Sequence, residues 1–182
     1  MTVLDRANED IRRRIRTIPD FPKPGIQFRD ITTLLLDPQG LALSVERLLE
    51  TVEGEIDLVA GIEARGFVFA PALALALGAG VLLIRKDGKL PGATIAEDYT
   101  LEYGSDRITI HADACAPGAK VLLVDDLIAT GGTARAAVRL LRKAGAIVEQ
   151  AAFVIDLPDL GGADALRAES IRVSSLVAFE GD

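Results

Sequence analysis

Two adjacent carboxylates and a glycine-containing turn stand close together in the sequence. Asp125 and Asp126 follow the apolar run Val121–Val124, and the turn Ala129–Thr133 reads "ATGGT". Glycines let a backbone bend and approach a ligand closely, and the N–H groups that open a helix favour an anion. The two threonines of the turn add hydroxyl donors. The combination predicts a binding site for a phosphate monoester.

The two aspartates need a different partner, because carboxylates and a phosphate repel each other. They are expected to face ribose hydroxyls or a divalent cation, and the first choice describes ribose 5-phosphate. No Walker A lysine follows the glycines, and in the dinucleotide fingerprint the acid follows the glycines instead of preceding them. The competing interpretation is a plain strand-to-helix turn with solvated aspartates. The residues predicted to bind phosphate and ribose are Asp125, Asp126, Ala129, Thr130, Gly131, Gly132 and Thr133.

Short apolar runs alternate with helical patterns, which is typical of an α/β fold with a mainly parallel sheet flanked by helices. The predicted strands are 56–62, 81–84, 107–111, 121–124 and 147–156. The predicted helices are 3–18, 67–77, one that opens at Asp37–Pro38, and one from the glycine turn to Gly145. Ligands bind at the carboxyl ends of parallel strands, which is where the acids and the turn are expected.

Composition limits the class of protein. The 182 residues are 49% hydrophobic and 26% charged, which predicts one globular domain over residues 1–182. The net charge of −7 argues against a general nucleic-acid binder, whose affinity comes from neutralising phosphates. A single cysteine and a single histidine argue against a disulfide framework and a zinc site.

The uncharged stretch Gly66–Ile84 has the length of a membrane span. Pro71 interrupts it near its start, and Gly78 and Gly80 interrupt it near its end. We interpret it as a buried helix, a glycine turn and a buried strand. The first 20 residues are charged and lack the apolar core of a signal peptide. The sequence therefore predicts a cytoplasmic protein that contacts neither membrane nor nucleic acid.

The segment "VLLVDDLIATGGT" (121–133) resembles the motif by which type I phosphoribosyltransferases bind 5-phosphoribosyl 1-pyrophosphate (PRPP). Five more segments are similar to the adenine-specific members and occur in the family's order: "FPKPGIQFRDITTLL", "GIEARGF", "LIRKDGKLPG", "LEYGSD" and "DLPDLGG". The resemblance covers nearly the whole chain. It implies that adenine and PRPP give AMP and pyrophosphate in purine salvage. It also implies Mg²⁺ bound mainly through PRPP, with no metal site of the chain's own.

The resemblance implies which residues hold pyrophosphate. They are Ala64, Arg65, Arg85, Lys86 and Lys89. In the family the peptide corresponding to Glu63–Ala64 is often cis. The basic loop that carries the last three residues reaches the active site of a neighbouring subunit, which implies a homodimer.

Glu102 matches the family's catalytic glutamate, which would exchange a proton with adenine N7 while N9 attacks the sugar. Tyr103 would accompany it. The segment of about 90–106 is polar and has few apolar residues to anchor it, so it is expected to be a flexible catalytic loop.

A small hood, from about 1–35 and 156–165, is expected to cover the base. The resemblance implies that Phe28 and Leu157 lie on either side of the purine ring. Backbone groups around Arg29 would read the adenine edge. A guanine or hypoxanthine enzyme needs a donor for O6, often a lysine, and the hood segment "VIDLPDLGG" has none.

Three other functions stay open. The same chemistry could act on xanthine or hypoxanthine. A PRPP-sensing regulator would share the fold without catalysis, but it needs a DNA-binding domain, and residues 1–20 are too short for one. A receiver-like switch domain needs an isolated phospho-acceptor aspartate, and it leaves "LEYG" and "FRDIT" unexplained.

Overall fold

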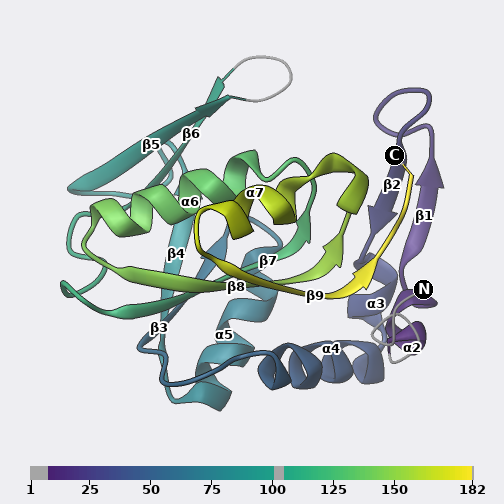
Figure 1. The fold of residues 1–182 in the computed structure, drawn as a ribbon, viewed down its shortest axis with the longest axis horizontal. Helices are drawn as coiled ribbons and strands as arrows, with labels where there is room; N and C mark the ends of the chain where they lie inside the picture. Colours follow the sequence, from purple (N-terminus) through teal and green to yellow (C-terminus); the bar gives the residue numbers. More distant parts are fainter. Residues whose placement is uncertain (1–7, 101–104, 182) are drawn as a thin grey trace.

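The computed structural model describes residues 8–100 and 105–181, and within them a seven-stranded sheet carries helices on both faces (Figure 1). The strand order is β5-β6-β4-β3-β7-β8-β9. The strands are β3 Leu58–Ile62, β4 Gly80–Lys86, β5 Thr94–Thr100, β6 Ser105–His111, β7 Lys120–Ile128, β8 Ile147–Asp156 and β9 Arg172–Ala178. Strands β4, β3, β7, β8 and β9 are parallel, and β5 and β6 join as an antiparallel arm. The predicted α/β fold is confirmed.

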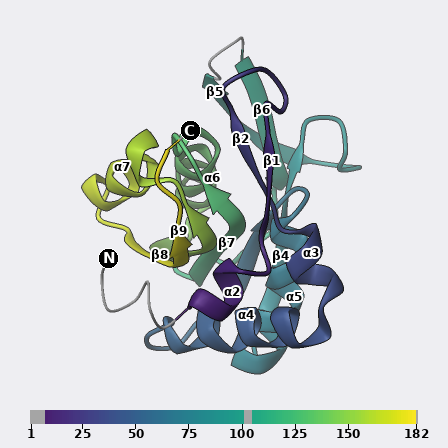
Figure 2. The same cartoon turned by 90° about the vertical axis from the view of Figure 1, so that its right-hand side faces the viewer.

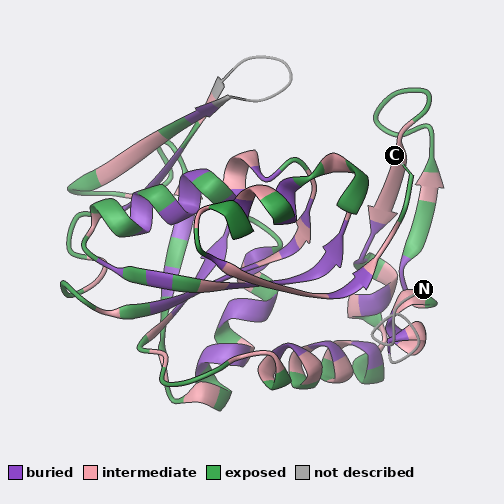
Figure 3. Cartoon of the chain, viewed as in Figure 1, coloured by how far each residue is buried: buried purple, intermediate pink, exposed green. Residues whose placement is uncertain are grey.

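Each face of the sheet has its own core. Helices α6 (Gly132–Lys143) and α7 (Gly162–Ala168) cover one face, and α4 (Pro38–Glu50) and α5 (Gly66–Leu77) cover the other (Figure 1). The central parallel strands are buried on both sides, as Figure 3 shows by their colour. This double burial explains why their sequences are almost continuously apolar.

The uncharged stretch of 66–84 forms α5 and β4, so the predicted order of helix, glycine turn and strand is confirmed. The prediction that both are buried is wrong for this chain by itself, because Val68 and Leu75 of α5 and Val81 and Leu83 of β4 are exposed. Helix α5 ends at Gly78, whose φ of +66° is a left-handed conformation that glycine adopts without strain. Among the described residues, no helix is both long and apolar enough to cross a bilayer. Helix α4 also begins as predicted, because the Asp37 side chain accepts a hydrogen bond from the Gln39 N–H and Pro38 occupies the first turn.

The predicted helix over 3–18 is wrong within the described residues. Helix α2 spans only Glu9–Arg12, and the chain then becomes strand β1 (Arg16–Pro19). Strand β1 pairs antiparallel with β2 (Gln27–Asp30), and the short helix α3 (Thr32–Leu36) follows. Figure 2 looks onto this hood hairpin, with α2 and α3 at its base. Ile11 and Ile15 are buried as a helix would bury them, but pairing with β2 overrides the local pattern beyond them.

The predicted loop of 90–106 is also wrong as secondary structure, because much of it is β-strand. Strand β5 pairs with β6 from Thr94↔His111 to Thr100↔Ser105. Ile95 and Tyr99 point inward, but Glu97, Asp98 and the threonines at both ends are polar, so the strand lacks the uniform apolar run that marks a central strand. Its mobility stays a prediction. Residues 101–104 lie outside the described part of the chain.

Candidate active site

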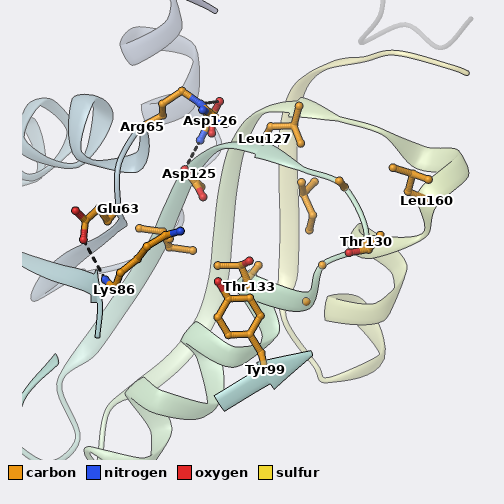
Figure 4. Close-up of a pocket in the computed structure, with 16 residues that line it drawn as sticks. Glu63, Arg65, Lys86, Tyr99, Asp125, Asp126, Leu127, Thr130, Thr133 and Leu160 are labelled. Atoms are coloured by element: carbon orange, nitrogen blue, oxygen red, sulfur yellow. Dashed lines mark hydrogen bonds and ion pairs between the residues drawn. The ribbon is translucent and has the colours of Figure 1, made fainter. Parts of the chain in front are cut away.

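A cavity of about 620 Å³ opens at the carboxyl ends of the parallel strands (Figure 4). It is lined by Ile62, Glu63, Arg65, Lys86, Tyr99, Leu160 and the continuous run Asp125–Ala134. The two aspartates and the whole "ATGGT" turn therefore lie around one space. The predicted strand 121–124 extends through β7 to Ile128, so the aspartates belong to the strand and do not follow it.

The two aspartates differ in their surroundings. The Asp126 side chain is 4% exposed, and its Oδ2 lies 2.5 Å from Nε of Arg65 (Figure 4). Asp125 Oδ1 accepts a hydrogen bond of 2.9 Å from the Asp126 N–H. Burial, followed by the adjacent charge of Asp126, raises the pKa of Asp125 well above its ordinary value. The site thus holds two acids side by side, one of them neutralised by Arg65.

The glycine turn packs tightly against the start of α7. Gly131 precedes α6 with a φ of +79°, and a Cβ there would lie 2.9 Å from the Cα of Gly162. A Cβ on Gly162 would lie 2.2 Å from the carbonyl oxygen of Ala129. The Gly162 N–H donates to that same oxygen at 2.9 Å. Gly162 therefore supports the turn, and sequence reasoning did not identify it.

Arg65 lies where two cavities meet. The Glu63–Ala64 peptide before it is cis, as the resemblance implied, and Ala64 itself is exposed. Besides the large cavity, Arg65 lines a second one of about 350 Å³ under the hood hairpin. The other residues of this hood cavity are Ile18, Phe21, Phe28, Arg29, Asp30, Ile31 and Thr32.

Of the predicted base residues, Phe28 and Arg29 line the hood cavity. The Phe28 ring meets Phe21 edge to face, with centroids 5.2 Å apart. Leu157 precedes the 3₁₀ helix η1 (Pro158–Leu160) and packs partly buried against the core. Among the described residues it is not one that lines either of these two cavities.

Of the basic residues, Lys86 lines the large cavity, and its Nζ lies 3.4 Å from Asp106 Oδ2. Arg85 is paired with Glu63, Nη2 to Oε1 at 3.1 Å, and also donates to the Lys89 carbonyl at 3.1 Å. The hydrogen bond from Arg85 lowers the pKa of Glu63. Arg85 and Lys89 are not among the residues described as lining the cavity.

Tyr99 and Glu63 line the cavity. Sequence reasoning missed Tyr99, and it named Glu63 only for the peptide bond that it forms with Ala64. Tyr99 is 8% exposed, and its hydroxyl donates to Asp106 Oδ2 at 3.0 Å. Burial raises its pKa. The sequence carries no clear signal for it, because Glu97 stands between Ile95 and Tyr99 at the period of a strand. The predicted Glu102 and Tyr103 lie outside the described residues.

The sequence matches the family model described as a phosphoribosyl transferase domain over residues 35–174. A protein of Maricaulis maris named adenine phosphoribosyltransferase is 56% identical, over 94% of this chain and 99% of its own. The matched range of the family model, residues 35–174, includes every residue described as lining the large cavity.

Solved structures of adenine phosphoribosyltransferases have the same fold as this chain. The adenine phosphoribosyltransferase of Rhodothermus marinus superposes with a TM-score of 0.89 at 50% identity, over 96% of this chain and 99% of its own. The enzyme of Saccharomyces cerevisiae gives a TM-score of 0.83 at 37% identity, over 93% and 98%. The yeast structure contains adenine together with an imino-altritol bisphosphate.

Proposed function

This chain belongs to the phosphoribosyl transferase family, among its adenine phosphoribosyltransferases of type I, and from that premise we propose how its two adjoining cavities divide the substrates. It is a pentosyltransferase that converts adenine and PRPP to AMP and pyrophosphate. The large cavity takes the phosphoribosyl group and pyrophosphate, and the hood cavity takes the base. The observation that carries this division is Arg65, which lines both cavities, where the bond between sugar and base must form.

In the large cavity, the turn Ala129–Thr133 binds the 5′-phosphate through its N–H groups and threonine hydroxyls. The start of α6 adds the positive end of a helix dipole. Asp125 and Asp126 accept hydrogen bonds from the ribose hydroxyls. These roles suit the groups that line the cavity, because donors gather at the turn and acceptors on β7.

Pyrophosphate leaves from C1 of the ribose as N9 of adenine bonds to it. Negative charge then grows on the leaving oxygens and positive charge on the sugar. Arg65 and Lys86 stabilise the leaving group, since preorganised cations act strongly where charge develops. Arg85 and Lys89 act from the basic loop on a neighbouring subunit's site. In the described structure Arg85 is paired with Glu63 of its own chain. When the dimer forms, we expect Arg85 to leave Glu63 and to bind pyrophosphate in the neighbouring subunit's site.

The base is adenine, held under the hood between Phe28 and the segment that contains Leu157. Backbone groups near Arg29 read its edge. The adenine bound in the yeast relative supports this choice, as does the absence of lysine from the segment 154–162. Glu102 exchanges a proton with N7, and Tyr103 assists it.

Phosphoribosyltransferases typically use PRPP as its Mg²⁺ complex. Asp125 and Asp126 offer carboxylate oxygens at the cavity, which suits an ion that takes its other ligands from phosphate and water. Among the described residues, no group of three or more acidic, histidine or cysteine side chains could form a metal cage. We expect PRPP to carry the ion, with the two carboxylates close to it as they accept from the ribose hydroxyls. When bound, it supplies positive charge to the pyrophosphate oxygens.

The assembly is a homodimer formed through α5 and β4. Val68 and Leu75 lie two turns apart on α5 and are 40% and 85% exposed. Val81 and Leu83 on β4 are 41% and 43% exposed. Val81 pairs in register with Val59, whose side chain packs in the α5 core, so all four belong to one side of the sheet. Clustered exposed apolar residues of this kind favour a protein partner.

The test is to mix the protein with PRPP, Mg²⁺ and one base at a time, and to assay the nucleoside monophosphate. AMP should form rapidly from adenine, while hypoxanthine, xanthine and guanine should react poorly. Turnover of hypoxanthine or guanine with little turnover of adenine would contradict the assignment of the base.

A further inference from the structure

The C-terminal segment Phe179–Gly181, which we call the tail, continues from β9 and lies beside the hood strand β2 (Figures 1 and 2). The Phe179 ring is approached by two guanidinium groups. Arg29, from β2, lies 4.6 Å from the ring centroid, and Arg12, from α2, lies 4.7 Å from it. Both distances are within the range of a cation–π interaction. One aromatic ring thus links the tail to the hood and to the first helix.

Arg29 has few other constraints. Its Nη1 donates to Thr17 Oγ1 at 2.8 Å, and its Nη2 reaches the Glu180 carbonyl at 3.5 Å. Its Nε is buried and has no hydrogen-bond partner among the described residues. Burial, followed by the charge of Arg12, lowers the pKa of Arg29. Arg12 also donates to the Ala178 carbonyl, so the ring and these hydrogen bonds together hold two cations that repel each other. Two of the partners of Arg29, the Phe179 ring and the Glu180 carbonyl, belong to the tail.

The tail is also bonded to the opposite side of the base site. The Phe179 N–H donates to the Asp156 carbonyl at 3.0 Å, and the Gly181 N–H donates to Asp159 Oδ2 at 2.8 Å. These two acceptors flank Leu157 in the sequence. The tail therefore contacts both segments between which the purine is expected to lie.

We infer that the tail is a positioning clamp for adenine, with Phe179 as its central residue. It sets the separation between the β2 segment that carries Phe28 and Arg29 and the segment that carries Leu157. Phe179 lines neither cavity, so it acts through Arg29 and not by touching the base. The inference rests on the proposed placement of adenine under the hood.

The test compares Phe179→Leu, which keeps an apolar side chain and removes the ring, with Phe179→Tyr, which keeps the ring. Phe179→Leu should raise KM for adenine about tenfold and leave KM for PRPP unchanged, because none of the described residues that line the phosphate cavity is hydrogen-bonded to the tail. Phe179→Tyr should stay close to the wild type. Val177→Ala, a buried change on β9 without contact to Arg29, serves as the control for lost stability.

A second readout does not depend on the ligand. In the free protein, Phe179→Leu should speed hydrogen exchange at the amides of β1 and β2, and Val177→Ala should not do so selectively. Unchanged exchange in β2, or equal changes of both KM values, would overturn the clamp. A wild-type protein that fails to use adenine would instead contradict the proposed function, whatever the exchange result.

Discussion

Arg65 connects the two cavities to the aspartates of β7. Its guanidinium group meets Asp126 at 2.5 Å, and it lines both cavities. Burial lowers the pKa of Arg65, but the charges of Asp126 and Asp125 outweigh that effect and raise it. A cation that stays charged between sugar and base sites suits a reaction in which pyrophosphate leaves as an anion.

At the same scale, Asp126→Asn should weaken PRPP and AMP binding. The change removes a charged acceptor and releases Arg65, and a charged hydrogen bond contributes about 1.5–3 kcal/mol. Isothermal titration calorimetry with AMP measures the loss. Asp98→Asn is the control, because Asp98 is exposed and pairs with Arg107. Equal AMP affinity in wild type and Asp126→Asn would remove the support for the ribose assignment.

Glu102→Leu should reduce kcat far more than it weakens PRPP binding, because a proton exchanged with N7 matters only in the transition state. A loss of about a hundredfold or more is expected from general acid–base catalysis. Glu97→Leu and Asp98→Leu are matched acids, whose partners are Arg139 and Arg107. Steady-state rates and PRPP affinities should separate the three. Similar modest losses in all of them would leave Glu102 without a chemical role.

Asp30 should make stability depend on pH. Its Oδ1 accepts from the Thr32 hydroxyl at 2.6 Å and its Oδ2 pairs with Arg16, and these contacts lower its pKa to about 2 from 3.8. A lowered pKa stabilises the fold above pH 4, and this contribution disappears as the pH falls through about 2. Asp30→Asn should therefore cost about 2 kcal/mol near pH 7, and the difference should shrink in acid.

Urea denaturation of both proteins between pH 7 and pH 2.5 measures this dependence. Asp113→Asn, a change at an exposed aspartate, should have little effect across the range. A difference between wild type and Asp30→Asn that stays constant down to pH 2.5 would contradict the role given to the Asp30 carboxylate.

At the scale of elements, the phosphate turn depends on α7. Gly162 admits the turn because it has no side chain, and a methyl group there would meet backbone atoms of Ala129, Thr130 and Gly131 within 2.8 Å. The turn opens α6, so a displacement at Gly162 moves the N–H groups that bind phosphate. The strand β7 and the helix α6 are therefore not sufficient for the site without a third element.

Gly162→Ala should lower the free energy of unfolding by about 1–3 kcal/mol and weaken AMP binding. Gly161→Ala is the matched control. Gly161 has a φ of +72° but nothing within 4 Å of a Cβ, so alanine there adds backbone strain of about 1 kcal/mol without touching the turn. Thermal unfolding and AMP titration compare the two. Loss of AMP affinity in Gly161→Ala as large as in Gly162→Ala would mean that general destabilisation explains both.

At the scale of the whole molecule, the arm β5–β6 and the hood hairpin lie on opposite sides of the molecule (Figure 1), since the arm forms one edge of the large sheet and the hood is a sheet of its own. They stand at the two ends of the site, one carrying Tyr99 and the other Phe28. Val68, Leu75, Val81 and Leu83 are the exposed apolar residues of α5 and β4. Strand β4 also carries Lys86, which lines the large cavity, so the surface that we propose for assembly adjoins the substrate site.

Leu75→Glu should convert a dimer to a monomer, because a buried charge at the centre of an apolar interface is costly. Sedimentation velocity measures the mass in solution. Ile147→Glu is the control, since Ile147 is 44% exposed on β8 and lies outside the α5–β4 surface. A wild-type protein that sediments as a monomer, or a Leu75→Glu protein that stays dimeric, would contradict the proposed interface.

Local patterns in the sequence determined the α/β class, the strands β3, β4, β6, β7 and β8, the helices α4, α5 and α6, and the phosphate turn with its two acids. Each of these features depends on a few residues that are neighbours in the sequence, such as Asp37–Pro38 before α4 or the run Val121–Val124 in β7. The same approach failed for 3–18 and 90–106, where pairing with a distant strand decides the structure. It also left β9 unassigned, because its apolar and polar residues follow no clear period and its burial is half-buried to buried throughout.

Only the tertiary structure decided how distant residues meet. Arg65 and Asp126 are 61 positions apart and pair because β3 and β7 are neighbours in the sheet. Gly162 contacts the turn Ala129–Gly131 because the segment after β8 lies beside the end of β7. Phe179 contacts Arg29 because the hood hairpin, a separate sheet, lies beside the end of β9. Such contacts depend on the order of the strands and on which faces the helices cover. No short window of sequence contains that information, because it is set by the packing of the whole chain.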